Sequence, residues 1–270
     1  MPIVQSSAGD VEYLVTGAGR PVTVFVPGLA MSIVDTRPFA SGVTGTKAFL
    51  HLRGHGRSSA PAPDDAQAWT YEALADDVAA VADEVDARQG VGVSLGAGAV
   101  LALAVREPER FTRLVLALPA ALDPATEASE HVERARGLED AALLADALDA
   151  HDAVAVAGLL VALQPESVRS RPDVKLWSRR HADALLATSV SRALRTLPGQ
   201  TPIVDASVLA SLEVPVLVLA QRDDWRHPLV VAENLAAVLP RAQLEVCDGS
   251  WLWSARDALR AAVSSFLSAG

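Results

Sequence analysis

The segment Gly92-Val93-Ser94-Leu95-Gly96 has residue types and a spacing that could support nucleophilic catalysis. It lies between a short apolar segment at 89–93 and a longer apolar stretch at 95–107. A serine on a sharp strand-to-helix turn needs glycine on both sides, because larger side chains would collide with the helix or a neighbouring strand. Such a turn exposes the hydroxyl and places it at a helix N-terminus, where free N–H groups favour negative charge. The pattern predicts a nucleophile elbow at Ser94.

The elements around this turn alternate between short β-rich segments and longer helical patterns, which is typical of a largely parallel sheet with crossover helices. Apolar residues at helical spacing follow Thr70, which is expected to cap a helix at 71–85. Strands are predicted at 11–15, 22–26, 48–52, 89–93, 113–119, 214–220 and 243–246, and further helices at 95–107, 228–238 and 255–267. We therefore predict an α/β domain.

The strand pattern stops between about residue 123 and residue 205. This stretch is rich in alanine, leucine, glutamate and arginine, and prolines 165, 172 and 198 divide it into three or four helical segments. We predict that residues 1–122 and 206–270 form one core, and that 123–205 form a helical lid inserted between its two parts. Such a lid would shield a pocket from water.

With this order of elements around the serine turn, the chain resembles the α/β-hydrolase superfamily over nearly its whole length. VPGLA at 26–30 is similar to the segment after the third strand of that fold, with Pro27 where a histidine is usual. The resemblance implies an oxyanion hole formed by the backbone N–H groups of Leu29 and Leu95. LRGHGRSS at 52–59 is similar to the family's Arg-Gly-His-Gly-x-Ser turn, and His51 replaces the usual leading aspartate.

The segment LAQRDDWRHP at 219–228 is similar to the one after the seventh strand, which supplies the acid of the catalytic triad. Its register against the following proline favours Asp224 over Asp223 as that acid. Both aspartates could instead cap the next helix. His227 stands at the start of the same helix, where we expect a structural role rather than a catalytic one.

The family resemblance places the catalytic histidine just after the eighth strand, but Trp251 stands there in the segment CDGSWLW at 247–253. The sequence has six histidines, and none follows residue 227. A serine hydroxyl depends on a neighbouring imidazole to take its proton. Loss of that imidazole from a serine protease costs about a million-fold in turnover. The sequence therefore predicts an atypical triad that lacks its histidine at the usual position.

Three functional hypotheses are compatible with this pattern. The first is a hydrolase-like enzyme that acts through Ser94 on a small apolar carbonyl compound such as an ester, thioester or lactone. Its base would come from another part of the chain, either from a histidine of the predicted lid or from the one next to the acid. The candidate bases are His131, His151, His181 and His227.

The second hypothesis is a non-hydrolytic isomerase, lyase or cyclase. It would use the oxyanion hole with Asp224 or Asp123 as the base. The third is an inactive ligand-binding protein whose pocket is lined or filled by Trp251 and Trp253, since tryptophan offers a flat apolar face. The glycines around Ser94 favour an enzyme, because a strained turn costs about 1–3 kcal/mol and gives an inactive protein no benefit.

The composition excludes several classes of partner. A formal net charge of -10, with no run of basic residues longer than two, argues against nucleic acids and anionic membranes. Cys247 is the single cysteine, so no intrachain disulfide is possible, and we expect a cytoplasmic protein. The sequence contains no phosphate-binding loop and no metal-ligand spacing, so no cofactor and no metal are expected. A small-molecule substrate or ligand is the expected partner, and the oligomeric state is left open.

Overall fold

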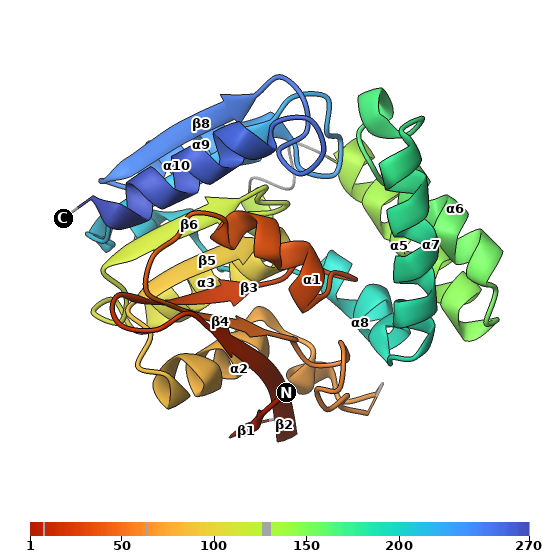
Figure 1. Ribbon diagram of the computed structural model, residues 1–270, viewed down its shortest axis with the longest axis horizontal. Coiled ribbons are helices and arrows are strands. Elements are labelled where there is room, and N and C mark those ends of the chain that lie inside the picture. Colours follow the sequence, from red (N-terminus) through yellow and green to blue (C-terminus); the bar gives the residue numbers. More distant parts are fainter. Residues whose placement is uncertain (8, 63, 126–130, 270) are drawn as a thin grey trace.

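The computed structural model describes the chain apart from residues 8, 63, 126–130 and 270, and describes residues 131–134 by their backbone alone. Its centre is an eight-stranded sheet with the order β1-β2-β4-β3-β5-β6-β7-β8 (Figure 1). The strands are β1 (Ile3–Ser6), β2 (Gly9–Thr16), β3 (Val22–Val26), β4 (Thr46–Leu50), β5 (Gln89–Val93), β6 (Arg113–Ala117), β7 (Val216–Gln221) and β8 (Ala242–Cys247).

Strand direction divides the sheet into two parts. β1 pairs antiparallel with β2, which pairs antiparallel with β4. From β4 through β3 and on to β8, each neighbouring pair is parallel. The sequence analysis did not predict β1, since this four-residue edge strand alternates between exposed and partly buried positions and has no apolar run. Its pairing with β2, from Ile3 opposite Glu12 to Ser6 opposite Gly9, defines it as a strand.

Helices cover both faces of the sheet because neighbouring strand residues point to opposite sides. On β3, Val24 packs in the cluster that includes the apolar residues of α2 (Tyr71–Glu84), α3 (Leu95–Arg106) and α9 (Leu229–Val238). The next residue, Phe25, packs in a second cluster with residues of α1 (Ile33–Thr36) and α10 (Arg256–Ser268). The side chain of Thr70 accepts a hydrogen bond from the backbone N–H of Ala73, as expected for the N-cap of α2.

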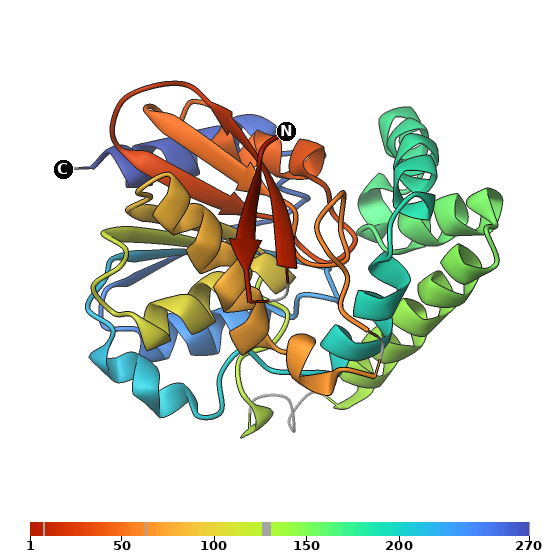
Figure 2. The ribbon, with the colours of Figure 1, turned by 90° about the horizontal axis from the view of Figure 1, so that it is seen from below.

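Between β6 and β7 the structure gives the bounds of α5 (His131–Asp149), α6 (Ala153–Ala162), α7 (Pro172–Leu186) and α8 (Val190–Thr196). Figure 1 shows them together at one end of the sheet, and Figure 2 shows the same separation from below. The lid boundaries at 123 and 205 stay a prediction. Short 3₁₀ turns lie at 37–40, 66–68, 166–168, 197–199 and 206–211. None of the helices within the described part of the chain is long and apolar enough to cross a lipid bilayer.

Candidate active site

Ser94 joins β5 to α3 in a strained backbone conformation, with φ of 51° and ψ of -114°. A Cβ atom on Gly92 would lie 2.3 Å from the carbonyl oxygen of Gly96, and a Cβ on Gly96 would lie 2.4 Å from the carbonyl oxygen of Val26. Both glycines are therefore required by close backbone approach. A non-glycine residue at positive φ in such a turn costs about 1–3 kcal/mol, and the tight packing around it holds the conformation in place.

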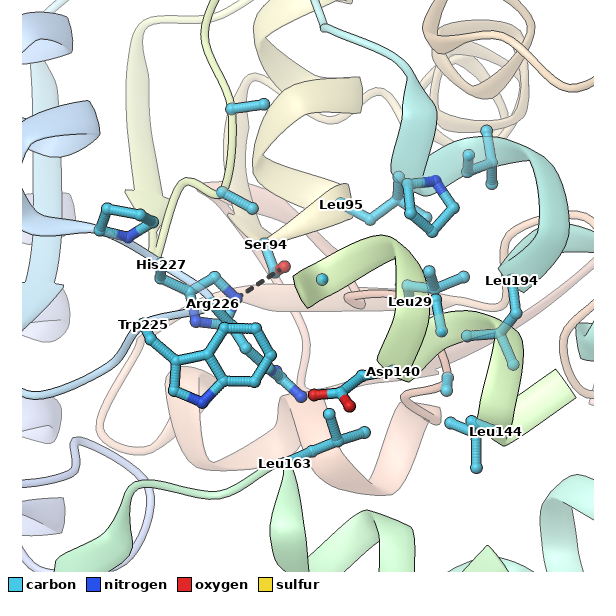
Figure 3. Close-up of a pocket in the computed structure, with 18 of the residues that line it drawn as sticks. Leu29, Ser94, Leu95, Asp140, Leu144, Leu163, Leu194, Trp225, Arg226 and His227 are labelled. Atoms are coloured by element: carbon cyan, nitrogen blue, oxygen red, sulfur yellow. Dashed lines mark hydrogen bonds between the residues drawn. The ribbon is translucent and has the colours of Figure 1, made fainter. Parts of the chain in front are cut away.

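A continuous chain of hydrogen bonds leads from Ser94 into the loop after β7. The Ser94 hydroxyl donates to Nε2 of His227 at 2.9 Å, as the dashed line in Figure 3 marks. Nδ1 of His227 donates to Oδ2 of Asp224 at 2.7 Å. The carboxylate accepts only, which places the imidazole proton on Nδ1 and leaves Nε2 to accept from the serine. His227 was one of the candidate bases, although a structural role was favoured for it, and the structure places it in direct contact with Ser94.

The local backbone explains how the acid and the histidine come from one short loop. The backbone N–H of His227 donates to the carbonyl oxygen of Asp224 at 3.1 Å, which closes a tight turn just before α9 begins at Leu229. The backbone N–H of Arg226 donates to Oδ1 of Asp224 at 3.2 Å. The turn folds the imidazole back over the carboxylate. The sequence signal was the spacing Asp224-x-x-His227 directly after a central strand.

Asp224 is 8 % exposed and is held from several sides. Nε2 of Gln221 donates to Oδ2 of Asp224 at 2.7 Å, the same oxygen that accepts from His227. Burial raises the pKa of Asp224, but the charge and hydrogen bond of His227, helped by Arg226 and Gln221, outweigh it and hold that pKa well below its usual range. The neighbouring Asp223 is exposed, with φ of 56°. The structure thus brings Asp224, and not Asp223, to the serine.

Trp251 belongs to the core and does not line either cavity next to Ser94. Its indole is 4 % exposed, and Nε1 donates to the carbonyl oxygen of Ala220 at 2.7 Å. Its backbone N–H donates to Oε1 of Gln221 at 3.1 Å. Trp253 does line the larger cavity, and its Nε1 donates to Oε1 of Gln164 at 2.9 Å. Of the two tryptophans, Trp253 therefore lines a cavity beside Ser94 and Trp251 lines neither.

Two cavities meet at Ser94. The smaller one has a volume of about 160 Å³ and is lined by Ser94, His227, both predicted oxyanion residues, Leu29 and Leu95, and further leucines of the inserted helices (Figure 3). A cavity of about 150 Å³ accepts benzene, so this space fits an arm of about six carbon atoms. The larger cavity, of about 550 Å³, shares Leu29, Ser94 and His227 with the smaller one and extends past Trp253.

The segment that contains Leu29 is fixed by the two histidines of the 51–55 turn. Nε2 of His55 accepts from the backbone N–H of Ala30 at 3.0 Å, and Nε2 of His51 accepts from that of Ile33 at 3.0 Å. Glu12, which is 1 % exposed, accepts from Nδ1 of His51 at 2.9 Å. Burial lowers the pKa of His55 to about 4, so its imidazole stays neutral and keeps its role as an acceptor. Both side chains therefore support the backbone beside Ser94.

Among the described side chains, the remaining candidate residues make no hydrogen bond to Ser94, although His181 lines the larger cavity. His151 is exposed and donates from Nδ1 to the carbonyl oxygen of Leu148, whereas the buried His181 donates from Nε2 to that of Ala30. The side chain of His131 lies outside the described residues. Asp123 accepts from the backbone N–H of Ala206 at 2.8 Å and lines neither cavity at Ser94. The part of the chain that the structure describes contains no cluster of potential metal ligands.

Comparison with protein families identifies one model, described as the alpha/beta hydrolase fold, that matches residues 22–250. The search of curated protein sequences finds no match for the chain. Solved structures, in contrast, match it over its whole length.

One such structure is an esterase from Exiguobacterium antarcticum, which is 16% identical with a TM-score of 0.78 and 99% of each chain covered. An enol-lactonase from Burkholderia xenovorans is 20% identical with a TM-score of 0.77, with 99% of this chain and 100% of that one covered. A meta-cleavage product hydrolase from Pseudomonas fluorescens is 16% identical with a TM-score of 0.77, with 99% and 97% covered. At these identities the likeness establishes the fold.

Proposed function

Because the chain belongs to the α/β-hydrolase fold family, we propose that it is a serine hydrolase of small carboxylic esters, thioesters or lactones. Ser94 is the proposed nucleophile, His227 the general base and Asp224 the acid. The observation that carries this proposal is the hydrogen-bond chain from the serine hydroxyl through the imidazole to the carboxylate, with distances of 2.9 Å and 2.7 Å. Distances in this range are those expected between a nucleophile, its base and the group that orients the base.

In the proposed reaction, Oγ of Ser94 attacks the substrate carbonyl while its proton passes to Nε2 of His227. The ionised Asp224 stabilises the imidazolium that forms. His227 then gives this proton to the leaving group as the acyl-enzyme forms. In the second half, His227 takes a proton from water, and the resulting attack releases the acid and regenerates Ser94.

We assign the oxyanion hole to the backbone N–H groups of Leu29 and Leu95. Both residues line the smaller cavity with Ser94. Leu95 is the first residue of α3, where helix geometry leaves the backbone N–H without an intrahelical acceptor. One oxyanion donor is worth about 10²–10³ in turnover, so its placement matters almost as much as that of the base. The hydrogen bonds from Ala30 and Ile33 to the two histidines support the position of the Leu29 segment.

The proposed substrate class is consistent with the comparisons. An esterase, an enol-lactonase and a meta-cleavage product hydrolase share the fold. The largely apolar lining and the volume of about 160 Å³ of the smaller cavity favour small substrates. The non-hydrolytic and inactive alternatives depended on a serine without a base, and the contact between Ser94 and His227 removes that reason for them.

Labelling with a fluorophosphonate probe, read by intact mass, tests this proposal. The wild-type protein is expected to gain one adduct, and Ser94→Ala none. Asp224→Asn is expected to slow labelling strongly, because the imidazole loses its orienting carboxylate. Asp223→Asn is the matched control, since it makes the same change in the adjacent, exposed residue. A folded wild-type protein that gains no adduct and cleaves no ester would contradict the proposed function.

A further inference from the structure

Arg226 brings a cation into the proposed active site. It stands between Asp224 and His227 in the chain, and its side chain lines both cavities that meet at Ser94. Figure 3 shows its guanidinium pointing towards Asp140 of α5 across the smaller cavity. The residue is partly buried, and its guanidinium makes no hydrogen bond or ion pair of 4.0 Å or less with any residue that the structure describes.

The charge of this guanidinium has no hydrogen-bonded counter-ion among the described residues. Burial lowers the pKa of Arg226, although the charges of Asp224 and Asp140 act in the opposite direction. A buried charge is costly unless it is paired and hydrogen-bonded. Asp224 already accepts from His227 and Gln221 through its Oδ2 atom, so its carboxylate is engaged. A group with two acceptor oxygens would complete the surroundings of Arg226.

Most carboxylates that line the two cavities have partners among the described residues, whereas the arginines there have no carboxylate partner. Arg256 donates from Nε to the carbonyl oxygen of Leu252 and lies over the ring of Trp253. Asp35 accepts from Ser32 and from Nε1 of Trp177. Asp173 is paired with Arg171 at 2.9 Å. Within the described residues, Asp140 is the cavity carboxylate without a hydrogen bond or ion pair, whereas no arginine of the lining has a carboxylate partner within 4.0 Å. These arginines are Arg180, Arg226 and Arg256.

The lining contains three arginines together with four aspartates, in a chain with a formal net charge of -10. Arg180 and Arg256 are exposed at the larger cavity, and Arg226 lies deeper, beside the proposed triad. Arginine presents its N–H donors as a planar fork that matches a carboxylate with two parallel hydrogen bonds.

We propose that Arg226 binds a carboxylate of the substrate, so that the enzyme prefers esters, thioesters or lactones that carry a negative charge. This inference rests on the proposed function and narrows its substrate class. The carboxylate would stand a few bonds from the scissile carbonyl, because Arg226 is adjacent to His227 in the chain and shares both cavities with Ser94. The rest of such a substrate is apolar, to match the leucines around Ser94.

Monomethyl adipate and dimethyl adipate form a suitable substrate pair because they differ by one negative charge at the end of the same chain. Hydrolysis is followed by pH-stat. The wild-type protein is expected to have the higher kcat/KM for the monoester. Arg226→Gln is expected to lower kcat/KM for the monoester about 10- to 100-fold, the range for hydrogen bonds to a charged group. It is expected to leave the value for the diester within about threefold.

Two further variants sharpen the test. Arg222→Gln removes the same charge from an arginine of the same loop that pairs with Asp248 and lines neither cavity, and both esters are expected to react as with the wild type. Asp140→Asn removes the unpaired opposing charge and is expected to raise kcat/KM for the monoester a few-fold. A wild-type preference for the diester, or an equal loss on both esters in Arg226→Gln, would overturn the proposal.

A binding measurement separates this proposal from the proposed function. Isothermal titration calorimetry of monomethyl adipate with Ser94→Ala protein needs no turnover. Binding that disappears when Arg226→Gln is added supports the carboxylate site even if the wild-type protein proves inactive. Binding that is unchanged in the double variant overturns the site, whatever the fluorophosphonate probe shows at Ser94.

Discussion

The loops that follow the last two strands of the sheet differ in what they supply. The loop after β7 carries both Asp224 and His227, three residues apart and joined at 2.7 Å. The loop after β8, where the family resemblance predicts the histidine, carries Trp251 with its indole bonded to the carbonyl oxygen of Ala220. Gln221 links the two loops, since it donates to Asp224 and accepts from the backbone N–H of Trp251.

In the proposed triad, the acid and the base therefore come from one loop and not from two. An acid and a base on two loops depend on the relative position of both, whereas here a single tight turn sets their distance. The loop after β8 contributes to the hydrophobic core instead, since Trp251 packs in the cluster that includes apolar residues of α10. The two loops remain connected through Gln221, which helps to orient the Asp224 carboxylate.

The largest effect is expected for His227→Ala. Loss of the base lowers kcat for an activated ester such as p-nitrophenyl acetate by about 10⁴- to 10⁶-fold. Adding Trp251→His is expected to restore nothing, because the side chain at 251 points into the core and not towards Ser94. Steady-state hydrolysis by the wild type, the single variant and the double variant checks this. Recovery of activity in the double variant would show that the loop after β8 can still supply the base.

Trp251→Ala is expected to lower the free energy of unfolding by about 3–5 kcal/mol, the usual cost of emptying a buried tryptophan site. The backbone N–H that bonds to Gln221 is retained. Ester hydrolysis per folded molecule should therefore stay within a few-fold of the wild type. Trp253→Ala, in the partly exposed cavity wall, is the control and should cost less stability. Denaturant titration and activity are measured on the same samples. Lost stability with retained activity assigns Trp251 to the hydrophobic core, and lost activity per folded molecule would contradict that.

The pH dependence of stability tests the structural role of the buried His55. The pKa of His55 falls from 6.5 to about 4 on folding, so the unfolded chain binds the extra proton between these values. Stability is complete above about pH 6.5 and decreases as the pH falls towards about 4, by up to about 3 kcal/mol. His55→Asn should have lower stability at neutral pH and a flatter dependence. Denaturant titrations of the wild type and His55→Asn across this pH range measure how the free energy of unfolding depends on pH. An equal dependence in the two proteins would contradict the role of His55 as a buried, neutral acceptor.

The smallest effect concerns the link between the two loops. Gln221→Leu removes one hydrogen bond to the Asp224 carboxylate and is expected to lower kcat about tenfold, with little change in KM, because Gln221 orients the acid. Gln221→Glu replaces the donor with a second carboxylate against Oδ2 of Asp224, and the repulsion between the two carboxylates should lower kcat at least as far as Gln221→Leu does. An unchanged kcat in Gln221→Glu, with normal folding, would argue that Gln221 is structural only.

Much of the fold could be predicted because its signals are local. The apolar segments of β3, β5, β6 and β7 are buried along their length and read as strands from composition alone. The edge strand β1 was missed because its pairing with β2, and not its own sequence, makes it a strand. Ser94 was identified because two glycines at fixed spacing are a strictly local requirement.

The sequence by itself determined the α/β class and the strained turn at Ser94, since both depend on residues that are close in the chain. The family resemblance favoured Asp224 over Asp223 as the proposed acid. Only the tertiary structure decided which histidine meets the serine, because Ser94 and His227 are 133 positions apart and come together through the parallel pairing of β5, β6 and β7. It also decided that Trp251 lies in the core and that Arg226 faces the cavities. Side-chain direction in a loop depends on the elements packed against it, and local sequence does not encode that packing.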